Sequence, residues 1–390
     1  MPTLRRRRPL QAVACLAAAA ALGGCASTSA STSSVTAKGR TLTIWISEPP
    51  GLSSDPVEQD VIHAEELAYD QQSAEVTSFK LGLREVAKPE LSANARTAIE
   101  DQSSVAYLGE LAPGSSAQTV GITNALDLLQ VSPTDTAAYL TQDVAGAPDF
   151  NHFLESYSTY GRTFAVVVPN TTEEAHAVVA EMAAKGAKSV YVSSDGSDYG
   201  NAIADAVRSA VSSEGLTVSA QETGADAVFY GSDAPAKAAA FFNAAAGTAP
   251  SALLFGSSSL DTPAFTGAVT AAAARRLLIS TPGFMPSRLP AAAHSFVTTF
   301  TTDYGHAPSG EAVFGYEAMS AVLHAIEAAG GAANDRAAVV REFFAIRNRS
   351  SVLGTYSLDT DGDTNLDAFV FNRVSGGTLV PVAAAPSGNS

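Results

Sequence analysis

Short apolar stretches alternate with segments of helical periodicity along most of this chain, and that alternation constrains its fold more than any other feature. Each apolar stretch has the length of a buried strand, and a polar turn usually separates it from the helical pattern that follows. Strands that alternate with helices in this way form parallel sheets covered by helices. The expected strands are 41–46, 105–109, 129–132, 163–168, 189–192, 216–219, 227–230, 253–255 and 277–280. The sequence therefore predicts an α/β protein.

The expected helices continue the same rhythm. Their apolar residues recur three or four positions apart, which is the spacing of one helix face. They are 61–72, 121–128, 171–186, 199–215, 311–328 and 335–349. Thr171 and Glu174 form a capping-box pattern, in which a hydroxyl and a carboxylate each bind a free backbone N–H at the start of a helix. Residues 359–371 are expected to turn back as a hairpin.

The first 24 residues predict a bacterial export signal. A basic cluster, Arg5 to Arg8, precedes an apolar run from Leu10 to Leu22. That run is shorter than the roughly 20 apolar residues of a membrane-spanning helix. It ends in a Leu-Gly-Gly-Cys motif that resembles the lipobox of bacterial lipoproteins, which implies that Cys25 is diacylated and becomes the mature N-terminus. An ordinary cleavable signal with an incidental cysteine is the alternative.

The residues after the signal predict a globular body held close to a membrane. Residues 25–40 are rich in Ser, Thr and Ala with almost nothing to bury, so we expect the lipidated Cys25 to be followed by a flexible tether. The body from Thr41 onward is long enough for two domains of ordinary size. It contains no cysteine, since Cys15 lies within the signal, and so neither a disulfide nor a cysteine metal site is expected.

The charge balance excludes some classes of partner. The chain has 23 basic and 39 acidic side chains, for a net charge of −16. Nucleic-acid phosphates must be neutralised by Lys and Arg, and anionic lipid attracts polybasic segments. We therefore expect neither nucleic acid nor an anionic lipid surface as a partner of the body.

No catalytic or cofactor motif stands out in the sequence. The histidines are scattered, without the i, i+4 spacing of a metal pair or a neighbouring nucleophile elbow. They are His63, His152, His176, His294, His306 and His324. Residues 359–365 look like a calcium loop, but Ser357 and Ala368 occupy positions one and twelve, where carboxylates are expected. A hairpin turn is the favoured interpretation, and we expect no enzyme activity, cofactor or metal.

Several segments, taken in order, resemble the type I periplasmic binding proteins, specifically the leucine/isoleucine/valine-binding branch that serves branched-chain amino acid ABC transporters. They are 105–109, 130–136, 186–192 leading to 198–200, 229–231, 256–265, 315–318 and 354–363. The resemblance implies two Rossmann-like lobes with parallel sheets, joined by three crossings, with the ligand in the cleft between them. It implies lobe one at 41–166 plus 284–350, and lobe two at 168–283 plus 351–385.

The resemblance also implies which residues touch the ligand. The turn that holds Ser115 and Ser116 matches one that grips the ligand carboxylate, and a helix start suits an anion; a plain helix cap is the alternative. Thr134 matches a position that offers backbone groups, and Thr136 one that offers a hydroxyl, unless both belong to a purely local turn. Tyr199 matches a loop position before a helix that lines the cleft from lobe two, with an aromatic staple for that helix as the alternative.

Two positions depart from the family pattern. Ser258 stands where the family places an acidic residue for the ligand ammonium, and Asp233 stands where amino-acid binders often carry an aromatic. Both argue against a zwitterionic branched-chain ligand, unless Asp233 or Glu48 pairs with the ammonium. The segment 141–162 looks longer than usual, and either reshapes the cleft rim or forms a surface loop.

Together these features predict an exported lipoprotein, anchored by its lipid to the outer face of the cytoplasmic membrane. We expect a monomer that captures a small polar ligand, such as an amino acid, an amide or a small carboxylate, for an ABC importer. The permease subunits would be separate chains. A ligand-sensing or envelope-regulatory lipoprotein of the same fold is the alternative, because the fold alone does not separate transport from sensing.

Overall fold

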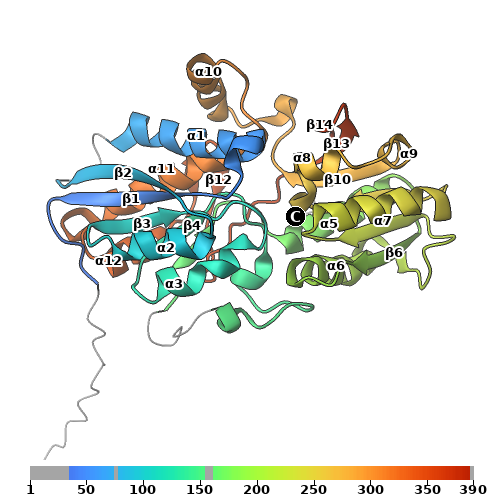
Figure 1. Ribbon diagram of the computed structural model, residues 1–390, viewed down its shortest axis with the longest axis horizontal. Helices are drawn as coiled ribbons and strands as arrows, with labels where there is room; N and C mark the ends of the chain where they lie inside the picture. Colours follow the sequence, from blue (N-terminus) through green and yellow to red (C-terminus); the bar gives the residue numbers. More distant parts are fainter. Residues whose placement is uncertain (1–34, 74–77, 154–160, 387–390) are drawn as a thin grey trace, which may run out of the picture. The chain divides into compact units, whose positions relative to one another are not determined.

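The computed structural model describes residues 35–73, 78–153 and 161–386 (Figure 1). The predicted signal, the lipidated Cys25 and most of the predicted tether therefore lie outside the described residues. Residues 35–40, the last of that tether, pack on the body. Ala37 is buried there, and its backbone N–H donates to the carbonyl of Asn334 at 2.6 Å. Residues 36–38 therefore belong to the packed body, although the sequence predicted them as part of the tether.

The first sheet has five strands, all parallel, in the order β2-β1-β3-β4-β5. They are β1 (Thr41–Glu48), β2 (Lys80–Ala87), β3 (Ser104–Leu108), β4 (Leu129–Ser132) and β5 (Phe164–Val166). On β1, Ile44 and Ile46 join one core cluster and Trp45 joins another, because successive side chains of a strand point to opposite faces. Both faces are thus buried, which explains why several of these strands read as continuous apolar runs.

Helices cover both faces of the first sheet (Figure 1). On one face lie α1 (Pro56–Gln72), α11 (Ala312–Ala329) and α12 (Arg336–Phe344), and on the other lie α2 (Leu91–Glu100) and α3 (Val120–Asn124). Helix α10 (Ala293–Tyr304) packs against α11 through Phe296 and Tyr316. Gly315 brings α1 and α11 close together, because a Cβ there would lie 2.3 Å from the carbonyl oxygen of Val61.

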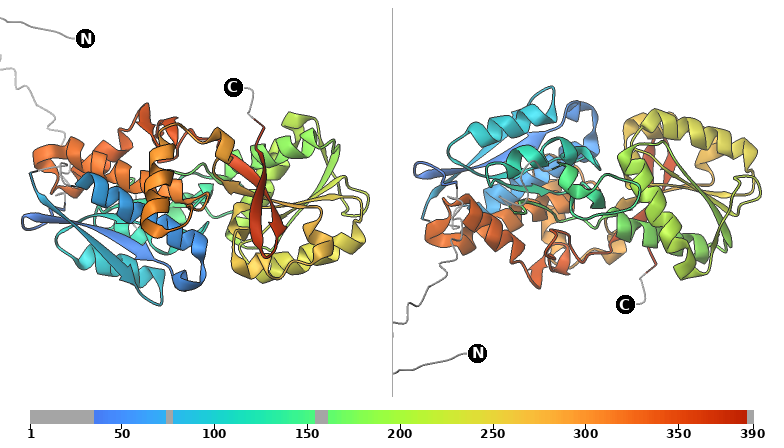
Figure 2. Two further views of the ribbon diagram at one scale, coloured as in Figure 1. Left: turned by 90° about the horizontal axis from the view of Figure 1, so that it is seen from above. Right: turned by 90° about the horizontal axis from the view of Figure 1, so that it is seen from below.

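The second sheet is mixed, in the order β14-β13-β10-β9-β8-β6-β7. Its strands are β6 (Ser189–Ser194), β7 (Thr217–Val218), β8 (Ala227–Gly231), β9 (Leu253–Gly256), β10 (Leu277–Pro282), β13 (Phe369–Ser375) and β14 (Thr378–Ala384). The run from β7 to β10 is parallel. The C-terminal hairpin of β13 and β14 adds an antiparallel edge, drawn in red in Figure 2.

Helices also cover both faces of the second sheet. They are α5 (Thr171–Ala184) and α6 (Asp198–Ala210) on one face, and α7 (Pro235–Thr248), α8 (Pro263–Thr266) and α9 (Ala271–Ala274) on the other. On β8, Val228 and Tyr230 pack with Phe242 of α7, whereas Phe229 belongs to the cluster that contains α5 and α6. Two sheets, each between helical layers, confirm the predicted α/β class.

Short elements complete the chain. Strands β11 (Arg349–Ser351) and β12 (Gly354–Tyr356) form a small antiparallel sheet. The 3-10 turns are η1 (Leu52–Ser54), η3 (Ser115–Gln118), η4 (Ala138–Leu140), η5 (Phe150–Phe153), η6 (Val211–Glu214), η7 (Ser258–Leu260), η8 (Pro286–Arg288) and η9 (Gly330–Ala332). The helix expected at 335–349 ends at Phe344 because the chain enters β11. The first sheet with α11 and α12 falls within lobe one as predicted from the sequence, and the second sheet within lobe two, but the lobe boundaries stay a prediction.

None of the helices in the described part of the chain is long and apolar enough to span a membrane.

Candidate functional site

Turns at the carboxyl ends of parallel strands from both sheets meet at one place. The turns after β4 and β9 supply Thr136 and Ser258, and α6, which follows β6, supplies Tyr199. The side-chain oxygens of Thr136 and Ser258 lie 3.2 Å apart, as do those of Tyr199 and Ser258. All three residues are buried. Loops beyond the carboxyl ends of strands are where open α/β sheets bind ligands, so this convergence defines the candidate site.

The Ser258 hydroxyl is the centre of this group, which we call the hydroxyl cluster: Thr136, Tyr199 and Ser258. It donates to Oε2 of Glu174 at 2.9 Å. A serine hydroxyl has one proton and two lone pairs. Because the Ser258 hydroxyl donates its proton in the hydrogen bond to Glu174, its oxygen can accept hydrogen bonds from Thr136 and Tyr199. Burial, followed by the charge of Glu174, raises the pKa of Tyr199 far above its ordinary value, so the phenol stays protonated as a donor.

Glu174 is a site residue that the sequence analysis assigned to a helix cap, and that prediction is wrong. The N-cap of α5 is Asn170, whose side chain accepts from the N–H groups of Thr172 and Glu173. Glu174 instead points into the second sheet and accepts from the N–H of Ser258 at 2.7 Å. A signal was present in the sequence, because Glu174 lies one helical turn before the apolar Val178 and therefore on the buried face.

The Glu174 carboxylate is fully buried at 0% exposure. Besides Ser258, it accepts from the Ser280 hydroxyl on β10 at 2.6 Å. Burial raises the pKa of the Glu174 carboxyl to about 7, against which the hydrogen bonds from Ser280 and Ser258 act. This group therefore changes its charge near neutral pH.

The turn that holds Ser115 and Ser116 donates its backbone N–H groups to another protein side chain, Asp135. Oδ1 of Asp135 accepts from the N–H of Gly114 at 2.5 Å, and Oδ2 accepts from the N–H of Ser116 at 2.9 Å. The N–H of Ala137 donates to Oδ1 as well, at 3.1 Å. An internal carboxylate thus occupies the donors that the resemblance assigns to a ligand carboxylate. Burial raises the pKa of Asp135 to about 6 even so.

The hydroxyls of this region also have internal partners. Ser115 donates to the carbonyl of Ala112, and the Ser116 hydroxyl accepts from the N–H of Glu110. Thr134 donates to the carbonyl of Leu111 at 2.8 Å. Among the lobe-one residues proposed from the resemblance, Thr136 is the one whose hydroxyl joins the hydroxyl cluster.

Gly114 brings this turn against the hydroxyl cluster. Its φ of +83° lies in the left-handed region that favours glycine. A Cβ at Gly114 would lie 2.5 Å from the Tyr139 hydroxyl and 3.6 Å from Cβ of Tyr199. Tyr199 itself lies in the first turn of α6, after the N-cap Ser197, rather than in the loop before the helix. The helix start places it under the turn after β3.

Asp233 does not join the hydroxyl cluster. It is exposed just before α7, and burial of its carboxyl together with the charge of Asp195 raises its pKa. More carboxylates lie near the site: burial raises the pKa of Glu311, at the N-cap of α11, well above its ordinary value, and neighbouring carboxylates raise it further. Those neighbours are Asp261, Asp55, Glu58 and Glu174. Several carboxyl groups thus lie close together beside the site, and their mutual repulsion favours the protonated form of Glu311.

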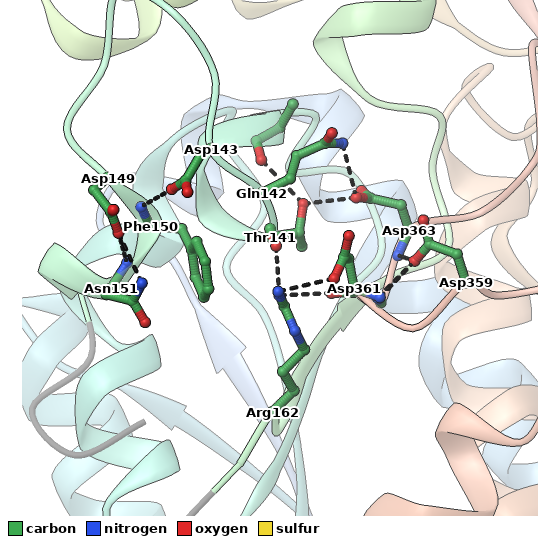
Figure 3. A network of polar contacts seen from close by, with 12 residues as sticks. Thr141, Gln142, Asp143, Asp149, Phe150, Asn151, Arg162, Asp359, Asp361 and Asp363 are labelled. Carbon is green, nitrogen blue, oxygen red and sulfur yellow. Dashed lines mark hydrogen bonds and ion pairs between the residues drawn. The ribbon is translucent and has the colours of Figure 1, made fainter. Parts of the chain in front are cut away.

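The described part of the segment 141–162 contacts two other parts of the chain. Arg162 pairs with Asp361 at 2.8 Å, and the Thr141 hydroxyl donates to Asp363 at 2.7 Å (Figure 3). At its other side, a Cβ on Gly146 would lie 2.7 Å from the carbonyl of Asn201 in α6. This segment therefore packs on the 359–363 turn and on α6.

The 359–363 turn is internally bonded, as the hairpin interpretation predicts. Oδ1 of Asp359 accepts from the N–H groups of Asp361, Gly362 and Asp363, and an isolated antiparallel bridge joins Leu358 to Thr364. In the described part of the chain, no group of three or more His, Cys, Asp or Glu residues is arranged to hold a metal ion.

The chain belongs to the periplasmic binding protein family, whose model matches residues 87–378. This confirms the resemblance and implies a solute-binding role outside the cytoplasm. No curated protein matches the chain. Its fold is similar to that of a leucine binding protein, LivK, from Thermotoga maritima, at 19% identity and a TM-score of 0.71, covering 90% of this chain and 100% of that one.

Two further solved structures show how widely this fold varies in its ligand. An ABC transporter substrate-binding protein from Desulfitobacterium hafniense, in complex with Leu, is 20% identical with a TM-score of 0.69, covering 88% of this chain and 100% of that one. A solute binding protein from R. palustris, in complex with benzoate, is 15% identical with a TM-score of 0.61, covering 89% and 96%. A zwitterion and a simple carboxylate thus bind to one fold, and the ligand must be inferred from the site.

Proposed function

We propose that this protein captures a small polar solute between the turns of its two sheets and delivers it to an ABC importer, without catalysing a reaction. The observation that carries the proposal is the hydroxyl cluster, in which Thr136 from one sheet meets Tyr199 and Ser258 from the other. Contacts between two hinged bodies can part to admit a ligand and form again around it. In this proposal Ser115, Ser116 and Thr134 support the side of the site that carries Thr136, and Asp233 stays a proposed ligand contact.

The experiment is a thermal-shift screen of the purified protein. Amino acids, amides, small carboxylates, amines and nucleosides are tested singly, because a ligand that binds only the folded state raises the melting temperature. A solute from this set should raise it in a concentration-dependent way. If no small solute does so, the proposed function is wrong.

Lipid anchoring at Cys25 is part of the same proposal, and it rests on the Leu-Gly-Gly-Cys motif. Two acyl chains hold a protein at a membrane far more stably than one. Cys25→Ser should move the protein from the membrane fraction to the soluble fraction. Unchanged retention of that variant would show that something other than this cysteine holds the protein there.

A further inference from the structure

The Glu174 carboxylate is buried without a cationic partner. Its hydrogen bonds come from the N–H and hydroxyl of Ser258 and the hydroxyl of Ser280, all of which are neutral. Among the described residues, no Lys, Arg or His forms an ion pair with Glu174. An ionised carboxylate out of water costs several kcal/mol unless a positive charge compensates it. A positive charge supplied from outside the chain would do so.

The Ser258 hydroxyl links the Glu174 carboxylate to the hydroxyl cluster. The Ser258 hydroxyl donates its hydrogen bond to Glu174, so its oxygen has lone pairs that accept from Thr136 and Tyr199. A group that enters between Thr136 and Ser258 therefore meets an acceptor with a carboxylate directly behind it. That arrangement favours a group with N–H donors and a positive charge.

The turn that binds Asp135, on the other side of the site, disfavours a negatively charged ligand group. The N–H groups of Gly114, Ser116 and Ala137, which could hold an anion, already donate to Asp135. A ligand carboxylate at that turn would lie against the carboxylate of Asp135. Two carboxylates in contact with each other repel.

We propose that the ligand carries a protonated amine, and that Ser258 and Glu174 recognise this amine at the hydroxyl cluster. The ligand class is a small organic cation, and a zwitterion should bind less tightly than the matching amine without a carboxylate. This inference rests on the proposed function, because it assumes that a solute enters between Thr136 and Ser258.

The proposal has a consequence for pH. A bound ammonium group favours the ionised form of Glu174, whose pKa burial raises to about 7 in the unliganded protein. Binding should therefore release a proton, and the affinity for an amine that stays protonated throughout, such as putrescine or benzylamine, should rise about ten-fold between pH 6 and pH 8. The titratable groups that act electrostatically with Glu174 are Tyr199 and Glu311. Asp261, whose pKa burial and Asp55 raise to about 7, acts through Glu311 with the same sign.

The test uses three sets of small molecules matched in shape. Each set contains an amine and a carboxylate or neutral counterpart: leucinamide, leucine and 4-methylpentanoate; putrescine, butane-1,4-diol and succinate; benzylamine, benzyl alcohol and benzoate. Affinity is measured by calorimetry at pH 8 and pH 6, in two buffers of different ionisation enthalpy. The binders should carry amines, and the pH 6 titration should report proton release. Leucinamide should bind more tightly than leucine at pH 6, where the amines of both are protonated.

Two variants separate Glu174 from its neighbour on the same helical turn. Glu174→Gln removes the buried charge, and Glu173→Gln removes a charge from the first turn of α5 outside the site. Losing a hydrogen bond to a charged group costs about ten- to a hundred-fold in affinity. Amine affinity should fall by that factor in Glu174→Gln alone, and proton release should disappear with it.

The outcomes distinguish the two proposals. If the carboxylates or alcohols bind and the amines do not, or if Glu174→Gln binds an amine as tightly as the unchanged protein, the amine assignment is wrong while solute capture stands. If Glu174→Gln fails to fold, the absence of proton release in the unchanged protein overturns the assignment. If neither this panel nor the wider screen contains a binder, the proposed function fails.

Discussion

Asp135 and Glu174 are two buried carboxylates on opposite sides of the candidate site, and they differ in what surrounds them. Asp135 receives backbone N–H groups, from Gly114, Ser116 and Ala137. Glu174 receives two serine hydroxyls and one N–H, from Ser258 and Ser280. A backbone N–H inside a turn has no other orientation, whereas a hydroxyl rotates. We infer that Asp135 holds the turn of the site in place, whereas Glu174 can change its hydrogen bonds and its charge when a ligand binds.

The largest expected effect breaks the structural half of this comparison. Asp135→Ala leaves three N–H groups without this acceptor, two buried and one partly buried, and each loss of a buried partner costs about 1–3 kcal/mol. The free energy of unfolding should fall by about 3 kcal/mol or more in urea denaturation. Asp303→Ala, at an exposed position of α10, serves as the control and should change it little. Equal stability of the two variants would show that the Asp135 bonds do not hold the turn.

The second prediction concerns the cost of ionising Glu174. Its pKa is about 7 in the folded state and near its ordinary 4.5 when unfolded. The folded state therefore binds more protons between these values, and stability should fall as pH rises through that window. At about 1.4 kcal/mol for each pH unit, the loss is roughly 3 kcal/mol.

Glu174→Gln has no proton to lose, so its stability curve should lack this fall. Urea denaturation of both proteins at pH 4.5, 6 and 8 measures the difference. Glu173→Gln should follow the unchanged protein across the same range. A constant difference between Glu174→Gln and the unchanged protein would mean that Glu174 titrates alike in the folded and unfolded states.

The third prediction sharpens the role of the turn that supports Asp135. Gly114 and Gly186 both have left-handed φ, of +83° and +89°, but only Gly114 has a neighbour where a Cβ would lie. Gly186→Ala should cost about 1 kcal/mol from the backbone alone. Gly114→Ala should cost at least about 1 kcal/mol more, because its methyl group clashes with the Tyr139 hydroxyl. Equal unfolding free energies would contradict the close packing of Tyr139.

The smallest expected effect concerns the contact that joins the two sides. Thr136→Val removes one bond between neutral hydroxyls, which contributes about 1 kcal/mol or less. The melting temperature of the unliganded protein should hardly change, while the affinity for a confirmed ligand should fall about ten- to a hundred-fold. A variant that binds normally would move the site away from Thr136.

Much of the fold could be predicted from the sequence because buried parallel strands leave an unmistakable apolar signal. The strand at 129–132 agrees with β4 residue for residue. Neither β2 nor α2 was predicted. Strand β2 lies at the sheet edge, where Arg84 and Glu85 are exposed and interrupt the apolar pattern. Helix α7 was not predicted either, because its alanine-rich sequence gives little contrast between a buried and an exposed face.

The site was harder to predict, because its decisive contacts join residues far apart in the chain. The family resemblance indicated Thr136, Tyr199 and Ser258, which the structure brings together. It gave no reason to connect Ser258 with Glu174, 84 positions earlier. The local sequence suggested a capping box at Glu174, but in the folded chain Glu174 accepts hydrogen bonds from Ser258 and Ser280 instead. Asp135 was passed over because its partners are backbone groups, which no sequence pattern displays.

The site itself is tested most directly by titration calorimetry of the most strongly stabilising solute against the unchanged protein and Ser258→Ala. The Ser258 hydroxyl contacts Thr136, Tyr199 and Glu174, so its removal disconnects the hydroxyl cluster. We predict at least ten-fold weaker binding by Ser258→Ala in a protein that remains folded, as judged by its melting transition. Equal affinity of the two proteins would show that the solute binds elsewhere.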